Sequence, residues 1–128
     1  MKLKSLDYVI LVVRDMERTI DFYRNILGLE ISHRSGDYVQ MSTGKTRLGF
    51  YTKDAMSNTI KMDLVEPPEN SFKFEIGFKV DNVDRVYKKL IDSGVKGAVP
   101  PVTRPWGQRT AYIYDPDENL IELAQDDS

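Results

Sequence analysis

The strongest constraint on the fold of this chain is an internal repeat that runs through most of its 128 residues. The segment 13–18, Val-Arg-Asp-Met-Glu-Arg, aligns with the segment 80–85, Val-Asp-Asn-Val-Asp-Arg, after a shift of 67 positions. In both copies an apolar run typical of a strand comes first, and an amphipathic helix pattern follows. A repeat of this size predicts two similar modules with pseudo-two-fold symmetry.

Each half follows the same predicted order: strand, helix and three further strands. Asp15 and Asn82 are placed to cap the two helices, and Gly28 and Gly94 to end them. The predicted strands are 6–13, 29–35, 38–42 and 46–51, then 74–80, 95–102, 108–114 and 120–124. The helical sides predicted to be buried carry Met16, Ile20, Tyr23, Ile26 and Leu27, then Val83, Val86, Tyr87, Leu90 and Ile91.

The predicted modules span about residues 4–51 and 72–125, and a polar, proline-bearing connection at about 52–71 joins them. A chain of 128 residues is long enough for one domain with a proper core, so we expect a single domain. The predicted fold class is α+β, with two tandem βαβββ modules whose mixed sheets curve toward each other and form a cup.

Composition excludes several classes of function. A net charge of −2 leaves no basic footprint for nucleic acid. The absence of cysteine excludes disulfides, thiolate metal sites and thiol catalysis. No apolar run approaches the roughly 20 residues of a membrane span, and the short apolar run after the N-terminus leads us to expect no signal peptide. We therefore expect a cytoplasmic protein with neither nucleic acid nor a membrane as its partner.

Strand alternation places four symmetry-related positions on the sheet face that the helices do not cover. In strand 120–124 the acid Glu122 lies between two apolar neighbours and points to that face. The shift of 67 positions pairs Tyr8 with Glu75. Aligning the turns before the last strand of each half, a shift of 73 positions, pairs Gly49 with Glu122. These four positions are predicted to line the cup.

The patterns resemble the vicinal oxygen chelate superfamily, which includes glyoxalase I, bleomycin- and fosfomycin-resistance proteins and extradiol dioxygenases. The resemblance implies that metal-dependent members take His and Glu ligands from the four paired positions. Here Tyr8, Gly49 and Glu75 occupy three of them and only Glu122 matches, while Glu118 replaces the family's usual glycine in the last turn. The metal-ligand set is therefore mostly lost. The resemblance rests on segments 6–13, 14–29, 78–84 and 115–123.

The resemblance implies a protein that binds a small organic molecule in the cup without a cofactor, and family members of this length are often homodimers. The alternative is a divalent-metal-dependent enzyme with an altered ligand set, a glyoxalase-like lyase or isomerase or a dioxygenase-type enzyme. In that case Glu122 and Glu75 would be catalytic or would bind Mn, Mg, Ni or Zn. A second alternative is a structural or regulatory module with a collapsed cup.

Other side chains are predicted to contact the ligand. Trp106 offers an aromatic face, and Arg104 and Arg109 can bind a carboxylate or phosphate through two hydrogen bonds. Trp106 can equally close the edge of the core beside its prolines. His33 is the only histidine and lies at none of the paired positions, so we expect an ordinary strand residue. The predicted ligand-binding residues are Tyr8, Arg47, Gly49, Tyr51, Trp106, Arg104 and Arg109.

The two acids also have a purely structural interpretation. In that case Glu75 pairs with Lys79 or Arg47, and Glu122 accepts a hydrogen bond from Tyr8. Both carboxylates would then be satisfied polar groups rather than a site.

Overall fold

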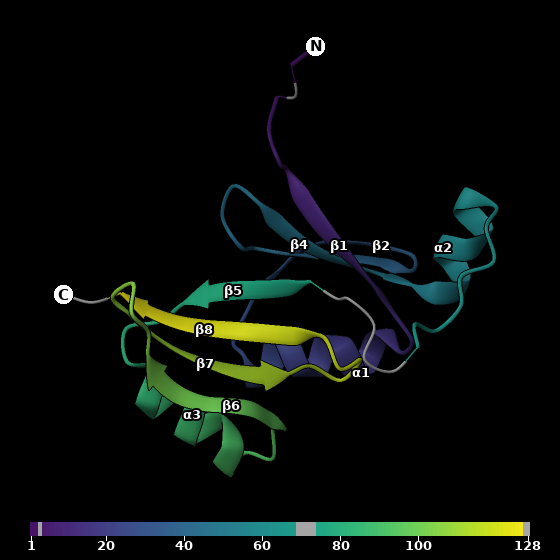
Figure 1. Ribbon diagram of the computed structural model, residues 1–128. Coiled ribbons are helices and arrows are strands. Elements are labelled where there is room, and N and C mark those ends of the chain that lie inside the picture. Colours follow the sequence, from purple (N-terminus) through teal and green to yellow (C-terminus); the bar gives the residue numbers. More distant parts are fainter. Residues whose placement is uncertain (3, 69–73, 127–128) are drawn as a thin grey trace. The chain divides into compact units, whose positions relative to one another are not determined.

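The chain forms two compact units, Met1–Pro67 (unit 1) and Pro68–Ser128 (unit 2), in a computed structural model that describes residues 1–2, 4–68 and 74–126. Each unit carries one four-stranded mixed sheet and a helix that follows its first strand (Figure 1). The end of the predicted connection and the start of the second module, near residues 71 and 72, lie outside the described residues.

Unit 1 is built on the strand order β1-β4-β3-β2. Strand β1 runs parallel to β4, and the other neighbours are antiparallel. The Asp15 carboxylate caps helix α1 by accepting a hydrogen bond from the Arg18 backbone N–H at 3.2 Å. The elements are β1 (Tyr8–Val13), α1 (Met16–Ile20), β2 (Ile31–Ser35), β3 (Tyr38–Met41) and β4 (Arg47–Thr52).

Helix α1 continues as a π-helix, η1 (Asp21–Ile26), before Gly28 turns the chain with a φ of +81°. The wider π turn changes which residues face the sheet. Phe22 is buried together with Tyr23, whose ring packs on Phe50 with 4.6 Å between the ring centroids. Ile26 remains 38% exposed, so its predicted burial was wrong.

A short helix, α2 (Lys53–Ile60), occupies the predicted connection directly after β4. The Thr52 hydroxyl accepts a hydrogen bond from the Ala55 backbone N–H at 3.3 Å, and Lys61 ends the helix with a φ of 58°. None of its residues is buried.

Unit 2 repeats the topology of unit 1 with the strand order β5-β8-β7-β6 and β5 parallel to β8. Asn82 caps helix α3 through a 3.1 Å hydrogen bond from the Arg85 backbone N–H. The apolar core of the unit includes Val83, Ile113 and Ile121. The elements are β5 (Glu75–Lys79), α3 (Val83–Asp92), β6 (Gly97–Thr103), β7 (Gln108–Tyr114) and β8 (Leu120–Asp126).

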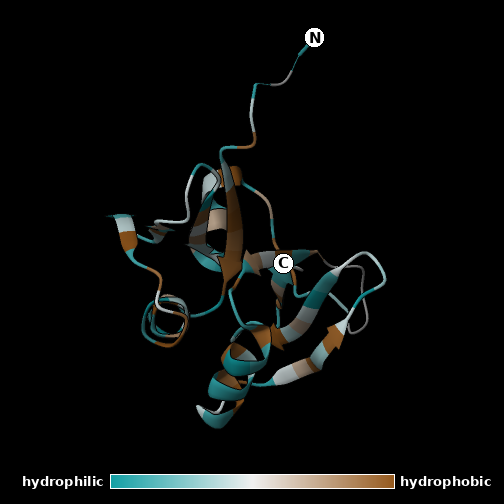
Figure 2. Cartoon of the chain, turned by 90° about the vertical axis from the view of Figure 1, so that its left-hand side faces the viewer, coloured by the Kyte–Doolittle hydropathy of each residue, from teal (hydrophilic) through white to brown (hydrophobic). Residues whose placement is uncertain are grey.

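The predicted α+β class and the βαβββ order are confirmed in both units. Several strands, such as β5, carry hydrophobic and hydrophilic residues in turn, as expected for sheets with one face on a core (Figure 2). The cup and the single domain stay predictions. In the part of the chain that is described, no helix has the length and apolar character needed to cross a membrane.

Candidate functional site

The sheet of unit 2 has one face toward helix α3 and one open face. Arg109 of β7 binds Asp84 of α3, which places Arg109, Ala111 and Ile113 on the helix side by strand alternation. The residues of opposite phase form the face that α3 does not cover, named the open face, on which Thr110 and Ala124 are nevertheless buried. It carries Glu75, Gly77 and Lys79 of β5, Leu120, Glu122 and Ala124 of β8, and Gln108, Thr110, Tyr112 and Tyr114 of β7.

Glu122 lies at the centre of this open face because β8 pairs with β5 on one side and with β7 on the other. The register sets Glu122 opposite Gly77 and opposite Tyr112. The Tyr112 hydroxyl donates a hydrogen bond to Glu122 Oε2 at 2.7 Å. A Cβ atom on Gly77 would lie 3.4 Å from Glu122 Oε1, so the missing side chain leaves the carboxylate accessible from that side.

The carboxylate controls the ionisation of its partner. The hydrogen bond to Glu122, together with burial and the charges of Glu122 and Glu75, raises the pKa of Tyr112 to about 12, and Arg104 opposes this shift. The purely structural interpretation of the sequence named Tyr8 as a donor to Glu122; the donor within unit 2 is Tyr112.

Glu75 lies on the same open face and is exposed. The predicted pair with Lys79 is not formed, because Lys79 pairs with Asp126. Asp126 also accepts a 3.1 Å hydrogen bond from Gln108, and these contacts lower the pKa of the Asp126 carboxyl group. Among the described residues, the Glu75 side chain forms neither a hydrogen bond nor an ion pair, while its backbone belongs to the pairing of β5 with β8.

The hairpin between β6 and β7 brings two more predicted residues to this region. Arg104 is partly buried, and its Nε donates to Thr110 Oγ1 of the open face at 2.9 Å. Trp106 is 68% exposed, and its Nε1 donates to Gln108 Oε1 at 3.0 Å. Arg109 is not brought together with them, because its Nε and Nη2 bind both carboxylate oxygens of Asp84 at 2.8 and 2.9 Å on the helix side.

In unit 1 the Tyr38 side chain lies against the position paired with Glu122, so a side chain there would require the tyrosine to move. A Cβ atom on Gly49 would lie 2.6 Å from the Tyr38 hydroxyl oxygen and 2.9 Å from a carbon of the same ring. The Tyr38 hydroxyl donates to Gln40 Oε1 at 2.9 Å, and burial and the nearby Tyr8 raise the pKa of Tyr38. The ring of Tyr38 therefore lies over position 49.

The remaining predicted residues of unit 1 share the face of Gly49. Tyr8 is 56% exposed and lies opposite Arg47 in the pairing of β1 with β4. The Tyr51 ring meets the Tyr38 ring edge-on at 6.1 Å, and its hydroxyl forms a 2.8 Å hydrogen bond with Thr59 of α2. His33 is exposed on β2, with its ring centroid 6.5 Å from that of Tyr38.

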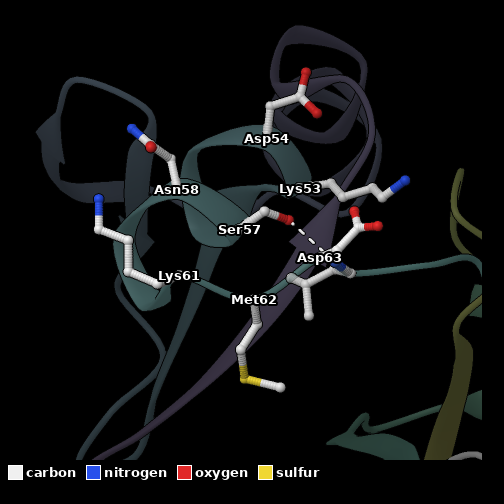
Figure 3. A pocket seen from close by; sticks show the side chains of 8 residues that line it. Lys53, Asp54, Ser57, Asn58, Lys61, Met62 and Asp63 are labelled. Carbon is white, nitrogen blue, oxygen red and sulfur yellow. Dashed lines mark hydrogen bonds between the residues drawn. The ribbon is translucent and has the colours of Figure 1, made fainter.

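The described residues contain a hollow of about 470 Å³ beside α2, away from these positions. Its labelled side chains fan outward instead of converging, and Ser57 Oγ accepts a hydrogen bond from the Leu64 backbone N–H at 3.4 Å (Figure 3). A second hollow of about 210 Å³ lies where β5 and β8 end and includes Lys79 and Asp126. No predicted site residue lines either hollow. The larger one is lined by Lys53, Asp54, Ser57, Asn58, Lys61, Met62, Asp63 and Leu64.

The donors at the four paired positions differ from the metal ligands that the family resemblance implies. Catalytic metal sites ordinarily take three protein ligands. Within residues 1–2, 4–68 and 74–126, no three His, Cys, Asp or Glu side chains lie close enough to hold one ion. Position 49 has no side chain, and one oxygen of Glu122 is bound to Tyr112.

Two tyrosine contacts were not predicted from the sequence: that of Tyr112 with Glu122, and that of Tyr38 with Gly49. A usable signal existed for Tyr112, since the turn that joins β7 to β8 pairs Tyr114 with Leu120 and therefore Tyr112 with Glu122. Tyr38 carried no such signal, because its contact with Gly49 depends on how its ring lies across the sheet.

A family model, related sequences and solved structures all match most of this chain. A family model described as a glyoxalase-like domain matches residues 6–126. The uncharacterized protein YraH of Bacillus subtilis is 33% identical over 117 residues, which cover 88% of this chain and 91% of YraH. The glyoxalase domain-containing protein RDO1 of Mycosarcoma maydis is 27% identical over 127 residues, 97% of this chain and 69% of RDO1.

Solved structures share the fold. A glyoxalase/bleomycin resistance protein/dioxygenase from Nocardioides superposes with a TM-score of 0.83 at 18% identity, covering 100% of this chain and 87% of that chain. A glyoxalase/bleomycin resistance protein/dioxygenase family enzyme from Burkholderia phytofirmans also gives a TM-score of 0.83, at 24% identity and with 95% and 98% coverage.

Proposed function

The chain belongs to the glyoxalase-like domain family of the glyoxalase/bleomycin resistance/dioxygenase superfamily, and from this premise we propose that it binds a small organic molecule on the open face of unit 2. The observation that carries the proposal is the Tyr112–Glu122 hydrogen bond beside Gly77. Only Oε2 of the carboxylate is engaged by a described residue. Oε1 can therefore accept a hydrogen bond from a hydroxyl or N–H group of a ligand.

A binding role suits this arrangement better than Lewis-acid chemistry. Small-molecule sites need a few well-placed polar groups among apolar and aromatic side chains. The open face offers the fixed Tyr112–Glu122 pair and the ring of Tyr114. The filled position at Gly49 and the engaged oxygen of Glu122 argue against the family's metal centre.

One observation favours the rival function, a metal-dependent lyase, isomerase or dioxygenase with an altered ligand set. Glu75 and Glu122 lie on the same face of one sheet, and carboxylate oxygens are suitable ligands for Mn²⁺ and Mg²⁺. Only two carboxylates would then anchor the ion, and water or substrate would have to complete its coordination.

Metal titration separates the two functions. Chelator-stripped protein is titrated with Mn²⁺, Ni²⁺ and Zn²⁺ in a calorimeter, beside Glu122→Ala, Glu75→Ala and the control Glu118→Ala in the β7–β8 turn. We expect no stoichiometric site tighter than roughly 10 μM, about −7 kcal/mol. A tighter site that disappears in Glu122→Ala and Glu75→Ala but persists in Glu118→Ala would establish the rival.

A thermal-shift screen of small organic molecules tests the binding role directly. We expect ligands whose stabilisation is reduced in Glu122→Gln and Tyr112→Phe and unchanged in Glu118→Gln, since the first two variants alter the hydrogen-bonded pair. A broad library without any such ligand would favour the structural or regulatory module instead.

A further inference from the structure

Arg104 and Arg109 are the two partly buried arginines among the described residues, and they are neutralised very differently. Arg109 binds both carboxylate oxygens of Asp84 and also donates to Thr103 Oγ1 at 3.0 Å. Arg104 has a single described side-chain partner, the uncharged hydroxyl of Thr110. Within the same unit, Arg109 is therefore a cation with a carboxylate partner, and Arg104 is a cation without one among the described residues.

A guanidinium that is partly removed from water loses hydration, and a carboxylate or phosphate partner restores favourable interactions. No described residue supplies such a partner to Arg104. Its Nη1 and Nη2 form no hydrogen bond with the described side chains or backbone, whereas Nε is held by Thr110 at 2.9 Å. These terminal nitrogens are the edge through which arginine binds an oxyanion with two hydrogen bonds.

The local backbone holds Arg104 at the open face of unit 2. In the β6–β7 hairpin, the Arg104 backbone N–H donates to the Gln108 carbonyl at 2.7 Å, and the Gly107 N–H donates to the Arg104 carbonyl at 3.1 Å. Thr110, which receives the Nε bond, is fully buried and has the same strand phase as Tyr112. The positive charge of Arg104 also acts on Tyr112. Arg104 therefore lies on the same sheet face as the Tyr112–Glu122 pair, bound to the residue that precedes Tyr112 on that face of β7.

We propose that Arg104 binds an oxyanion group, a carboxylate or a phosphate, of the small molecule held on the open face of unit 2. This inference rests on the proposed function and adds the chemical class of the ligand, an organic anion. The ligand's acidic group would bind the guanidinium, and its hydrogen-bond donor would meet Oε1 of Glu122. The negative charges of Glu75 and Glu122 would direct the acidic end away from themselves and toward Arg104.

Protein NMR tests the proposal with benzoate as the anionic probe and benzamide as a neutral probe of the same size. The side-chain signals of Arg104 Nε–H and Trp106 Nε1–H report on the hairpin directly. We expect benzoate to bind at least about tenfold more tightly than benzamide, which corresponds to about 1.4 kcal/mol. That preference should be lost in Arg104→Gln, partly kept in Arg104→Lys, and unchanged in the matched control Arg109→Gln.

The outcomes separate this inference from the proposed function. Equal binding of benzoate and benzamide on the open face, unaffected by Arg104→Gln, would overturn the inference and leave the proposed function standing. Failure of both probes and of inorganic phosphate to shift signals of the open face would overturn the inference and count against the proposed function as well.

Inorganic phosphate identifies the source of the oxyanion. Displacement of benzoate by phosphate, with loss of the phosphate effect in Arg104→Gln, would support a site that accepts phosphorylated ligands. Benzoate binding that depends on Arg104 and resists phosphate would support a carboxylate ligand.

Discussion

Strand pairing determines which side chain faces Glu122. Alternation within one strand predicted the face of Glu122 correctly as the one opposite α3, yet it could not name the neighbour, which lies on another strand. The register of the β7–β8 hairpin makes Tyr112 that neighbour. Gly49 is the opposite case, because the ring above it belongs to β3 and no pattern in β4 indicates it. At the residue scale, strand alternation therefore predicts which sheet face a side chain points to. It does not predict which side chain of a neighbouring strand it contacts.

The pKa of Tyr112 has a direct consequence at alkaline pH. The phenol ionises near 10.0 in an unfolded chain and at about 12 in the folded protein. The folded state thus holds the proton more tightly, so this contribution to stability is complete below pH 10 and is lost as the pH rises through 12. In an absorbance titration of tyrosinate, one tyrosine should ionise well after the exposed ones.

Two variants check the assignment of that late ionisation. Tyr112→Phe should remove the step, and Glu122→Gln should move it to lower pH because the hydrogen bond to a charged carboxylate is lost. A late step that survives in Tyr112→Phe would show that another tyrosine is responsible.

Gly49 is required by packing rather than by backbone conformation. We expect Gly49→Ala to lower the free energy of unfolding by about 1–3 kcal/mol, since the new methyl group would overlap the Tyr38 ring. Gly77→Ala is the matched control on the other sheet, with an ordinary 3.4 Å contact to Glu122 Oε1, and should cost clearly less. Urea unfolding measures both.

A double-mutant cycle identifies the ring as the cause. In a Tyr38→Val background the cost of Gly49→Ala should largely disappear, because the overlapping ring has been removed. Equal costs in both backgrounds would assign the effect to the strand backbone instead.

At the scale of elements, the repeat located every strand to within about two residues, and the errors have physical causes. Helix α2 lies inside the predicted connection and was not predicted as a helix, because it buries no residue and so lacks an apolar stripe. The π-helix η1 shifted burial from Ile26 to Phe22, since sequence periodicity assumes 3.6 residues per turn. For both α2 and η1, local hydrogen bonds determine the structure, and the spacing of apolar residues does not reveal them.

The β7–β8 turn carries Glu118 with a φ of 63°, a conformation that favours glycine. This explains physically why glycine suits the position. Glu118→Gly should raise the free energy of unfolding by roughly 0.5–1 kcal/mol, because the left-handed conformation would no longer be strained. Thermal and urea unfolding can both detect this gain.

Glu118→Ala separates backbone strain from charge. Like the glycine variant, it removes the exposed ion pair with Lys96, whose atoms are 3.5 Å apart and which should contribute little. It keeps the Cβ atom, so its stability should stay close to that of the wild type. Equal stabilisation by alanine and glycine would contradict the assignment to backbone conformation.

At the scale of the whole molecule, the repeated topology was predictable because each unit forms its own sheet and core from local sequence patterns. Assembly was not predictable in the same way, since it depends on surfaces that the patterns leave exposed. On β1 of unit 1, Tyr8 and Val12 are 56% and 40% exposed. Exposed apolar residues that lie together on a surface often mark contacts with another chain.

We propose that the chain is a homodimer in which a second copy covers the exposed apolar side chains of β1 in unit 1, Tyr8 and Val12. β1 and β5 are edge strands whose outer backbone groups are not paired within their sheets, and such edges often join other chains.

Sedimentation equilibrium should give about twice the monomer mass of 14.7 kDa, falling toward the monomer on dilution. Val12→Lys should weaken association because it places a charge on that surface, whereas Val65→Lys, in the segment after α2, should not. A monomer at every concentration would overturn the proposal, and equal effects of both lysines would place the contact elsewhere.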